Sequence, residues 1–107
     1  IRVHIGRHLR DPGLSLDHIA SAMNCSKRHL HKAFSAEDDT LAQYIQRQRI
    51  EACMRDLADP RRAERTITEI AFSWGFNNTA HFSRVFREHT GVTPSAFRAG
   101  ALPGAAR

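Results

Sequence analysis

Apolar residues recur at intervals of three and four along most of this chain, which is the period of amphipathic helices. The spacing predicts a first helix over residues 2–10, ended by the turn signal at residues 11–13. Ser15 and Ser26 then stand where helix caps are expected, each before a helix with one apolar face. The faces consist of Leu16, Ile19, Ala20 and Met23 in one helix and of Leu30, Ala33 and Phe34 in the next. This pair predicts a helix-turn-helix at about residues 15–37.

A long helix is predicted next, from about Thr40 to about Ala58. Thr40 and Gln43 have the spacing of a capping box, and Pro60 ends the helix because proline cannot continue it. The core candidates are Leu41, Ile45, Cys53 and Leu57, with Tyr44, Ile50 and Met54 beside them. Residues 61–65 are expected to form a charged surface loop.

A second helix-turn-helix is predicted at about residues 66–90. Thr66 and Glu69 form another capping box, Gly75 marks the turn, and Asn78 caps the following helix, which ends at Gly91. The apolar positions are Ile67, Ile70, Ala71 and Trp74 before the turn, and Phe82, Val85 and Phe86 after it. A short last helix starts at Thr93-Pro94 and packs Phe97 on the core, and residues 99–107 are expected to be a flexible tail.

The two helix-turn-helix segments match each other position by position, which we interpret as an internal repeat. Ahead of the turn the matching positions are 51 residues apart, and after it they are 52 apart. The turn residues Asn24 and Gly75 correspond, and both types tolerate the left-handed backbone of a tight turn. The other matches are Leu16 with Ile67, Ile19 with Ile70, Ala20 with Ala71, Ser26 with Asn78, Leu30 with Phe82, Lys32 with Arg84, Ala33 with Val85 and Phe34 with Phe86.

The second helix of each repeat carries cations opposite its apolar side. In the first copy the outward positions are Arg28, Lys32 and Ser35, with His31 on the flank; in the second they are Ala80, Arg84 and Arg87, with Ser83 on the flank. A helix face that is merely solvated usually mixes charges of both signs, yet Glu88 near one edge is the one acid here. The chain as a whole carries 16 Lys and Arg against 11 Asp and Glu, a net charge of +5. Simple solubility would explain that charge alone, but its placement favours nucleic acid.

We therefore expect a DNA-reading surface. Arg28, Lys32 and Arg84 can donate to guanine O6 and N7, and Thr79 and Ala80 can contact a thymine methyl group. His31 can reach a base or a phosphate. The phosphate candidates are Lys27, Arg47 and Arg87, and the free backbone N–H groups at the helix starts after Ser26 and Asn78.

Other chemistry is weakly supported. His4 and His8, or His29 and His31, have metal-ligand spacing, but without nearby acid or Cys partners surface histidines are the favoured interpretation. No catalytic triad, phosphate-binding glycine loop or carboxylate pair is present in the sequence, so we expect no enzyme and no cofactor. Cys25 and Cys53 form no disulfide framework, which favours a reducing cytoplasm. We expect Cys53 to be buried and inert, whereas Cys25 is either a small buried residue or, if exposed in its turn, an oxidant sensor.

One domain is expected from 107 residues of which 41% are hydrophobic. The sequence has neither an apolar run long enough for a membrane span nor a signal peptide. Its first residue is Ile1 and not Met, which we interpret as a fragment of a longer protein.

These residues resemble the C-terminal DNA-binding domain of AraC/XylS-type transcription regulators. The resemblance covers residues 1–98 and is most specific from Ile67 to Arg98, with I-x-x-I-A, G-F, H-F-S-R-x-F and G-V-T-P-x-x-F-R in order. The first copy fits more loosely, with S-x-x-x-L-x-x-x-F from Ser26 and Y-I-x-x-x-R-I from Tyr44. The resemblance implies an all-α fold of seven helices, with two helix-turn-helix subdomains joined by the long central helix.

The resemblance also implies sequence-specific binding of double-stranded DNA and regulation of transcription, usually activation with contacts to RNA polymerase. Two recognition helices would enter successive major-groove segments, about one helical turn (~34 Å) apart. The family's base-contacting positions fall on Arg28, His31, Lys32, Thr79, Ala80, His81 and Arg84, although His81 lies at the side of its helix. An effector-binding or dimerisation domain would precede this segment in the full protein.

Two departures from the family pattern affect the predicted contacts. Ser35 and Asp39 stand where a basic residue and a glycine are usual, and Ala80 replaces a commonly polar residue. Readout by the second copy would then depend on Arg84. One alternative is an architectural or protein-interaction domain without sequence preference. A DNA-repair enzyme with a reactive cysteine is disfavoured, because neither cysteine sits among ligands or bases.

Overall fold

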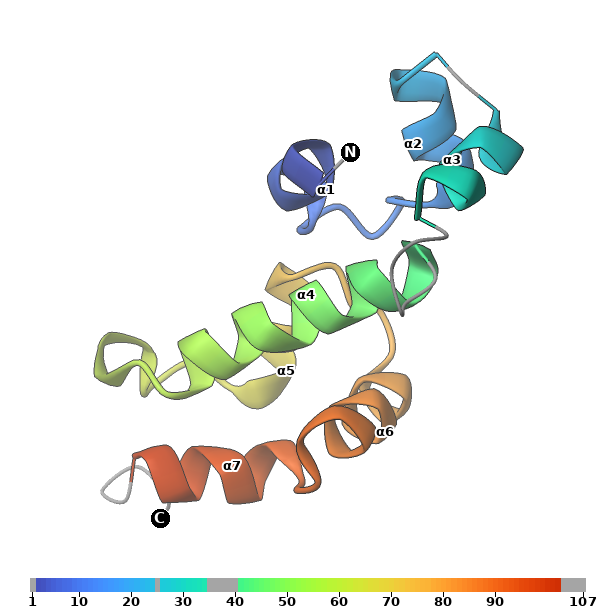
Figure 1. Ribbon diagram of the computed structural model, residues 1–107. Coiled ribbons are helices and arrows are strands. Elements are labelled where there is room, and N and C mark those ends of the chain that lie inside the picture. The colour runs from blue at the N-terminus through green and yellow to red at the C-terminus, as the bar shows by residue number, and fades with distance from the viewer. Residues whose placement is uncertain (1, 25, 35–40, 103–107) are drawn as a thin grey trace.

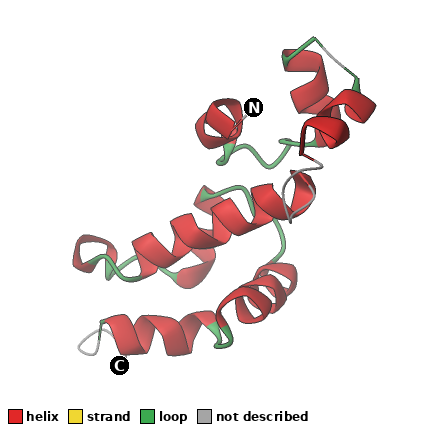
Figure 2. Cartoon of the chain, in the orientation of Figure 1, coloured by secondary structure: helices red, strands yellow, loops and turns green. Residues whose placement is uncertain are grey.

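Residues 2–24, 26–34 and 41–102 are described in a computed structural model of the chain. The described residues form seven α-helices and one 3-10 helix and contain no strand (Figure 2). The helices are α1 (Arg2–His8), α2 (Leu16–Ala22), α3 (Lys27–Phe34), α4 (Leu41–Leu57), η1 (Pro60–Arg62), α5 (Ile67–Ser73), α6 (Thr79–Thr90) and α7 (Pro94–Ala101). The predicted all-α fold, with two helix-turn-helix units and a long helix between them, is confirmed. No helix in the described part of the chain has the length and apolar character needed to cross a membrane.

Where the structure describes the residue before a helix, its polar side chain accepts a hydrogen bond from a backbone N–H group. Ser15 and Ser26 accept from the third residue after them, at 3.2 and 3.1 Å. Thr66 and Glu69 form both halves of the predicted capping box, at 3.0 and 2.9 Å. Asn78 accepts from His81 N at 2.9 Å, as its predicted cap role requires. The other predicted capping box, of Thr40 and Gln43, includes a residue that lies outside the described part of the chain.

Some boundaries differ from those predicted. Helix α1 ends at His8, two residues early, and Val3 is 68% exposed because it points away from the buried side that holds Ile5 and Leu9. Met23 is also exposed, because it is already the C-cap of α2. Helix α7 continues to Ala101, so it extends into residues 99–107, the stretch expected to be a flexible tail.

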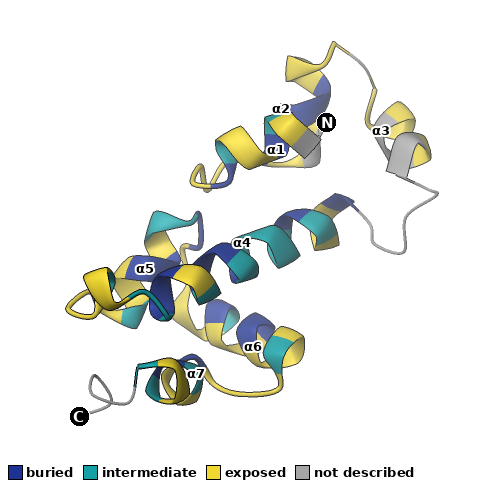
Figure 3. Ribbon diagram, turned by 60° about the vertical axis from the view of Figure 1, so that its left-hand side comes forward, coloured by how far each residue is buried: buried dark blue, intermediate teal, exposed yellow. Residues whose placement is uncertain are grey.

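Helix α4 carries two apolar cores, one toward each end (Figures 1 and 3). The first core consists of Ile5, Leu9, Leu14, Ile19, Ala20, Leu41 and Ile45. The second consists of Ile50, Cys53, Leu57, Ile70, Ala71, Phe76, Phe82, Val85 and Phe86, with Phe97 of α7 packed against it as predicted. Trp74 packs against both cores. The 17 residues of α4, about 25 Å long at 1.5 Å per residue, therefore join the two units in a molecule 48 Å long and 22 Å wide.

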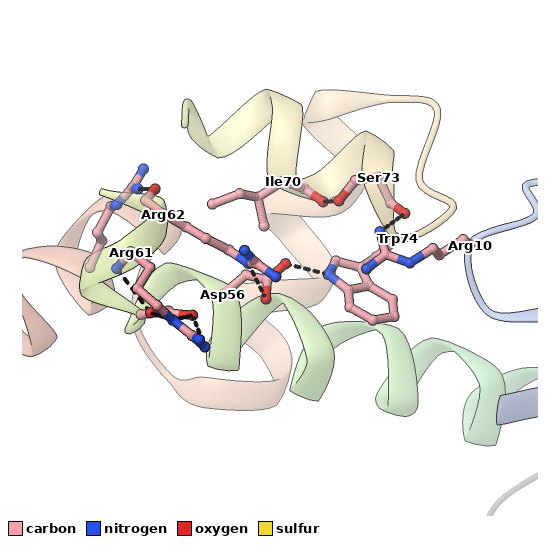
Figure 4. Close-up of polar contacts among 9 residues, drawn as sticks. Arg10, Asp56, Arg61, Arg62, Ile70, Ser73 and Trp74 are labelled. Atoms are coloured by element: carbon pink, nitrogen blue, oxygen red, sulfur yellow. Dashed lines mark hydrogen bonds and ion pairs between the residues drawn. The ribbon is translucent and has the colours of Figure 1, made fainter. Parts of the chain in front are cut away.

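A polar chain fastens the second unit to the C-terminal part of α4 (Figure 4). The buried carboxylate of Asp56 accepts from Trp74 Nε1 at 2.8 Å and from Arg62 Nε at 3.1 Å. The buried Arg98 donates to the carbonyl oxygens of Arg65 and Arg62, at 2.6 and 2.7 Å. Residues 61–65 are thus not simply the charged surface loop expected: the segment begins with η1, and its carbonyl groups hold α7 in place.

A second set of contacts, which we name the junction, joins the segment after α1 to α4 and to the turn of the second unit. Arg49 of α4 donates to Leu9 O at 3.0 Å and to Asp11 O at 2.7 Å. The guanidinium of Arg10 stacks 3.9 Å from the centre of the Trp74 ring. Figure 4 also shows Arg10 donating to the carbonyl oxygen of Ser73, at 3.0 Å.

Corresponding residues of the two turns, Asn24 and Gly75, both have positive φ. Asn24 has φ 53° and Gly75 has φ 99°, so both predicted turn residues are left-handed. A Cβ atom on Gly75 would lie 2.5 Å from Leu9 O and 2.8 Å from Arg49 Nε, because this turn packs against the junction. Glycine is therefore required at residue 75 by space as well as by backbone conformation.

We predict that Gly75→Ala lowers the free energy of unfolding by about 2–4 kcal/mol, because a left-handed alanine and a forced contact both oppose folding. Gly91→Ala is the matched control, since Gly91 has φ 84° but nothing within 4 Å of its added Cβ. The free energy of unfolding of Gly91→Ala should fall by only about 1–2 kcal/mol. Chemical denaturation of the two variants measures the difference, and equal losses would show that the junction tolerates displacement.

Candidate nucleic-acid interface

The exposed faces of α3 and α6 bring most of the predicted DNA-contacting residues to the surface. On α3, Lys27, Arg28 and Lys32 are exposed. On α6, the exposed residues include Thr79, Ala80, Ser83, Arg84 and Arg87, and further along the helix Glu88 and His89. The side chain of His31 and the whole of Ser35 lie outside the described residues. The predicted outward orientation of the cationic positions therefore holds wherever the structure describes it.

Lys27 is placed at the start of α3, next to an acid of the preceding helix. Its Nζ lies 3.0 Å from Asp17 Oδ1, and both side chains are largely exposed. An exposed ion pair of this kind contributes about 0–1 kcal/mol, so an anion can displace the carboxylate at small cost. The hydroxyl of Ser26 accepts from His29 N and so orders the first turn, whose N–H groups point toward the helix start.

His81 occupies a different position from the other predicted readers. It is half-buried at the side of α6, where its Nε2 lies 3.4 Å from Gln46 Nε2 and its Nδ1 lies 3.2 Å from Arg84 Nη2. Its ring centre is 6.3 Å from that of Phe76. The side chain therefore lies between α4 and the outward face of α6.

Arg47 is half-buried on α4, and its guanidinium lies 5.7 Å from the centre of the Tyr44 ring. It borders a hollow of about 200 Å³ between α4 and α6, whose lining also includes Glu88 and His89. Arg47 therefore lies on the side of α4 that borders α6.

A larger cleft of about 350 Å³ lies between the two helix-turn-helix units. Its walls come from the loop before α2, from α4, from the turn before α6 and from α6 itself. The polar side chains among its lining residues are Ser15, Gln46, Arg49, Asn77 and His81. Arg49 is engaged in the junction, whereas Gln46 and His81 lie against each other across the cleft wall.

The predicted histidine pair of α1 is part of a cluster of three rings. His4 and His8 stack with centres 4.2 Å apart, and His18 of α2 meets them edge-on at 5.8 and 5.7 Å. Burial lowers the pKa of His4, and the neighbouring imidazoles lower it further. Over the described part of the chain, no group of three or more His, Cys, Asp or Glu side chains is placed to hold a metal ion. The second pair, His29 and His31, lies partly outside the described residues.

Cys53 is fully buried in the second core, as its position on the apolar stripe predicts. Burial, together with the nearby carboxylate of Asp56, raises the pKa of its thiol to about 12. The thiol is therefore protonated at neutral pH and inert as a nucleophile. Cys25, the predicted alternative for redox chemistry, lies outside the described residues.

Several residues that join the helices through side-chain contacts had no predicted role. Gln46, Arg10 and Asp56 sit at ordinary helix-surface or loop positions in the sequence, and nothing in their spacing marks their partners. Arg49 did have a signal, because it is the arginine of the Y-I-x-x-x-R-I pattern. Its function in the structure is to bind backbone carbonyl groups of the junction.

Comparison with known proteins agrees with this geometry. Residues 19–100 match the family model described as a helix-turn-helix domain. The regulatory protein SoxS of Salmonella typhimurium is 35% identical over 95 residues, which are 88% of this chain and 85% of SoxS. The chain belongs to the AraC/XylS family. Domains of this family bind DNA in transcription regulators and are not enzymes, so the predicted class is confirmed.

Relatives in this AraC/XylS family differ in total length. The transcriptional activator NphR of Rhodococcus is 35% identical over 94 residues, but these make up 88% of this chain and only 27% of NphR. The C-terminal domain of AraT, a response regulator from Geobacillus stearothermophilus, superposes with a TM-score of 0.85 at 26% identity, covering 92% of this chain and 80% of that one. The chain thus spans about a quarter of NphR and most of SoxS.

We predict that Cys53 does not react with a water-soluble disulfide reagent at about pH 8 while the protein is folded, since its thiol is still protonated there and shielded by the core. The measurement uses a Cys25→Ser variant, so that any reacting thiol is Cys53. One thiol should react after denaturation. Rapid reaction of one thiol in the native protein would show that the second core opens far more readily than its packing implies.

Proposed function

We propose that this domain binds double-stranded DNA sequence-specifically and thereby regulates transcription, with α3 and α6 in successive major-groove segments. One observation carries the proposal: corresponding helices of two helix-turn-helix units, fixed to one long helix, both expose cations on their outward faces. A molecule 48 Å long can hold two such helices about one DNA turn (~34 Å) apart. The family relationship supports DNA as the ligand.

The two half-sites would be read by unequal sets of side chains. On α3, Arg28, His31 and Lys32 supply the base contacts, with the cations favouring guanine O6 and N7. On α6, Thr79 and Ala80 contribute contacts to thymine methyl groups near the helix start, and Arg84 supplies the charged hydrogen bonds. Because Ala80 offers no hydrogen bond, discrimination in the second half-site depends mainly on Arg84.

Phosphate contacts would fix the orientation of the domain on the duplex. Lys27, Arg47 and Arg87 supply side-chain cations for this purpose, and the helix starts after Ser26 and Asn78 supply backbone N–H groups. Of these, Arg87 is exposed on α6, and Lys27 would exchange its carboxylate partner for a phosphate. Such contacts carry little sequence information but dominate the salt dependence of binding.

In the cell we infer a cytoplasmic regulator, most simply an activator that also touches RNA polymerase. NphR, one of the relatives, is named a transcriptional activator. The match to a C-terminal domain of a response regulator supports the presence of a further, N-terminal domain for effector binding or dimerisation in the full protein.

We predict that Arg84→Ala weakens binding to the duplex the wild-type domain prefers by about 1–3 kcal/mol, because it removes the charged base contact of the second half-site. Binding to random duplex should weaken much less. Arg55→Ala is the matched control: Arg55 is an exposed arginine of α4 with the same charge, on neither α3 nor α6. Fluorescence anisotropy titrations at several salt concentrations measure the affinity for the preferred duplex and for random duplex. The affinity of the wild-type domain should fall steeply as the salt concentration rises.

Equal losses of affinity in Arg84→Ala and Arg55→Ala would show that Arg84 contributes only its positive charge and no base contact. Equal affinity of the wild-type domain for preferred and scrambled duplexes would favour the architectural alternative, in which the same helices bind DNA without reading it.

A further inference from the structure

His81 links α4 to the proposed DNA-reading face of α6. Gln46 of α4 lies against its Nε2 at 3.4 Å, and Arg84 lies against its Nδ1 at 3.2 Å. The three side chains thus form one row from the half-buried cleft wall to the exposed surface.

The hydrogen atoms available to these groups determine how the row must be arranged. A guanidinium only donates, so Nδ1 of His81 has to accept from Arg84. In a neutral imidazole the other nitrogen, Nε2, then carries the hydrogen. Gln46 must therefore present an acceptor to it, although its Nε2 amide nitrogen faces the ring at 3.4 Å. A half-turn of the amide exchanges nitrogen for oxygen and satisfies all three groups.

The row constrains an otherwise flexible side chain. Arg84 is exposed, and arginine loses much rotamer freedom when it is ordered on DNA. A hydrogen bond to His81 orders part of that side chain before DNA arrives. One N–H is used for this bond, and the remaining donors of the planar fork stay available for a guanine.

The charged side chain that lines the same cleft as Gln46 and His81 is already engaged elsewhere. Arg49 lines the same cleft, but its guanidinium is already directed to the carbonyl groups of Leu9 and Asp11. Phe76 flanks the ring of His81, with its centre 6.3 Å away, and limits movement on that side.

We infer that Gln46 is a positioning residue for readout by α6: its amide oxygen accepts from the Nε2–H of His81, and this bond stabilises the tautomer whose Nδ1 holds Arg84 in place. The inference rests on the proposed function, and it gives His81 a supporting role between α4 and Arg84 in place of direct base contact. It also makes α4 a contributor to specificity and not only a connector.

The first test needs no DNA. In the free wild-type domain at about pH 8, where histidine side chains are commonly neutral, ¹⁵N NMR of the imidazole should show a protonated Nε2 and an unprotonated Nδ1 for His81. Gln46→Met removes the acceptor at similar length, so the tautomer preference should weaken or reverse. Gln46→Glu restores an acceptor and should restore the preference. A wild-type ring protonated on Nδ1, or a Gln46→Met ring with an unchanged preference, would overturn the inference.

The second test measures base discrimination. Two duplexes are compared: the preferred one, and one substituted at the base pair whose recognition Arg84→Ala impairs. In Gln46→Met the ratio of the two affinities should fall about three- to tenfold, which corresponds to the free-energy cost of ordering one long side chain. Gln46→Glu should keep the ratio even if its charge weakens all binding. Gln48→Met, a half-buried neighbour on α4, is the control and should change neither readout.

The two tests fail in different ways. An unchanged ratio in Gln46→Met, with Arg84→Ala still lowering discrimination, would overturn the positioning role and leave the proposed function intact. If the wild-type domain discriminates at no base pair, the proposed function fails, and with it the readout role of Gln46. The NMR result would then still report whether the row of hydrogen bonds exists.

Discussion

The structure depends on the way α4 is shared between two apolar cores. Its N-terminal part closes the first core through Leu41 and Ile45, and its C-terminal part closes the second through Ile50 and Leu57. Trp74 contacts both cores, and Arg49 ties the middle of α4 to the segment after α1. Neither helix-turn-helix unit can therefore turn far without breaking this packing or the hydrogen bonds of Arg49 to Leu9 O and Asp11 O. Rigidity of this kind is what a reader of two fixed half-sites needs.

The internal repeat explains the similarity of the two units, and the junction explains their difference. The first turn uses Asn24, whereas the second must use Gly75 because its backbone touches Leu9 and Arg49. The outward helices differ as well: α3 exposes Arg28 and Lys32, while α6 exposes Arg84, which lies 3.2 Å from His81 of the same helix. In our proposal the second helix-turn-helix unit thus reads DNA with fewer side chains than the first. Its main reader, Arg84, is ordered by His81 and Gln46 before DNA binds.

Much of the fold was predictable because it is encoded locally. The capping box of Thr66 and Glu69, the cap at Asn78 and the buried stripe of α4 all follow from residues within a few positions of one another. The bonds of Arg49 and Trp74 were not predictable, since their partners lie 40 and 18 residues away and one of them is a backbone carbonyl. The candidate site was also predictable only in part. The helical period places Arg84 outward, but its contact with His81 and the contact of His81 with Gln46 of α4 are seen only in the structure.

The central claim is that α3 and α6 read two DNA segments at one fixed separation. Selection of bound duplexes from a random pool, followed by sequencing, tests it most directly. The account predicts two enriched half-sites with a constant spacing of about 10 base pairs between their centres, one turn of the duplex. A single enriched half-site, two half-sites at variable spacing, or no enrichment at all would contradict it.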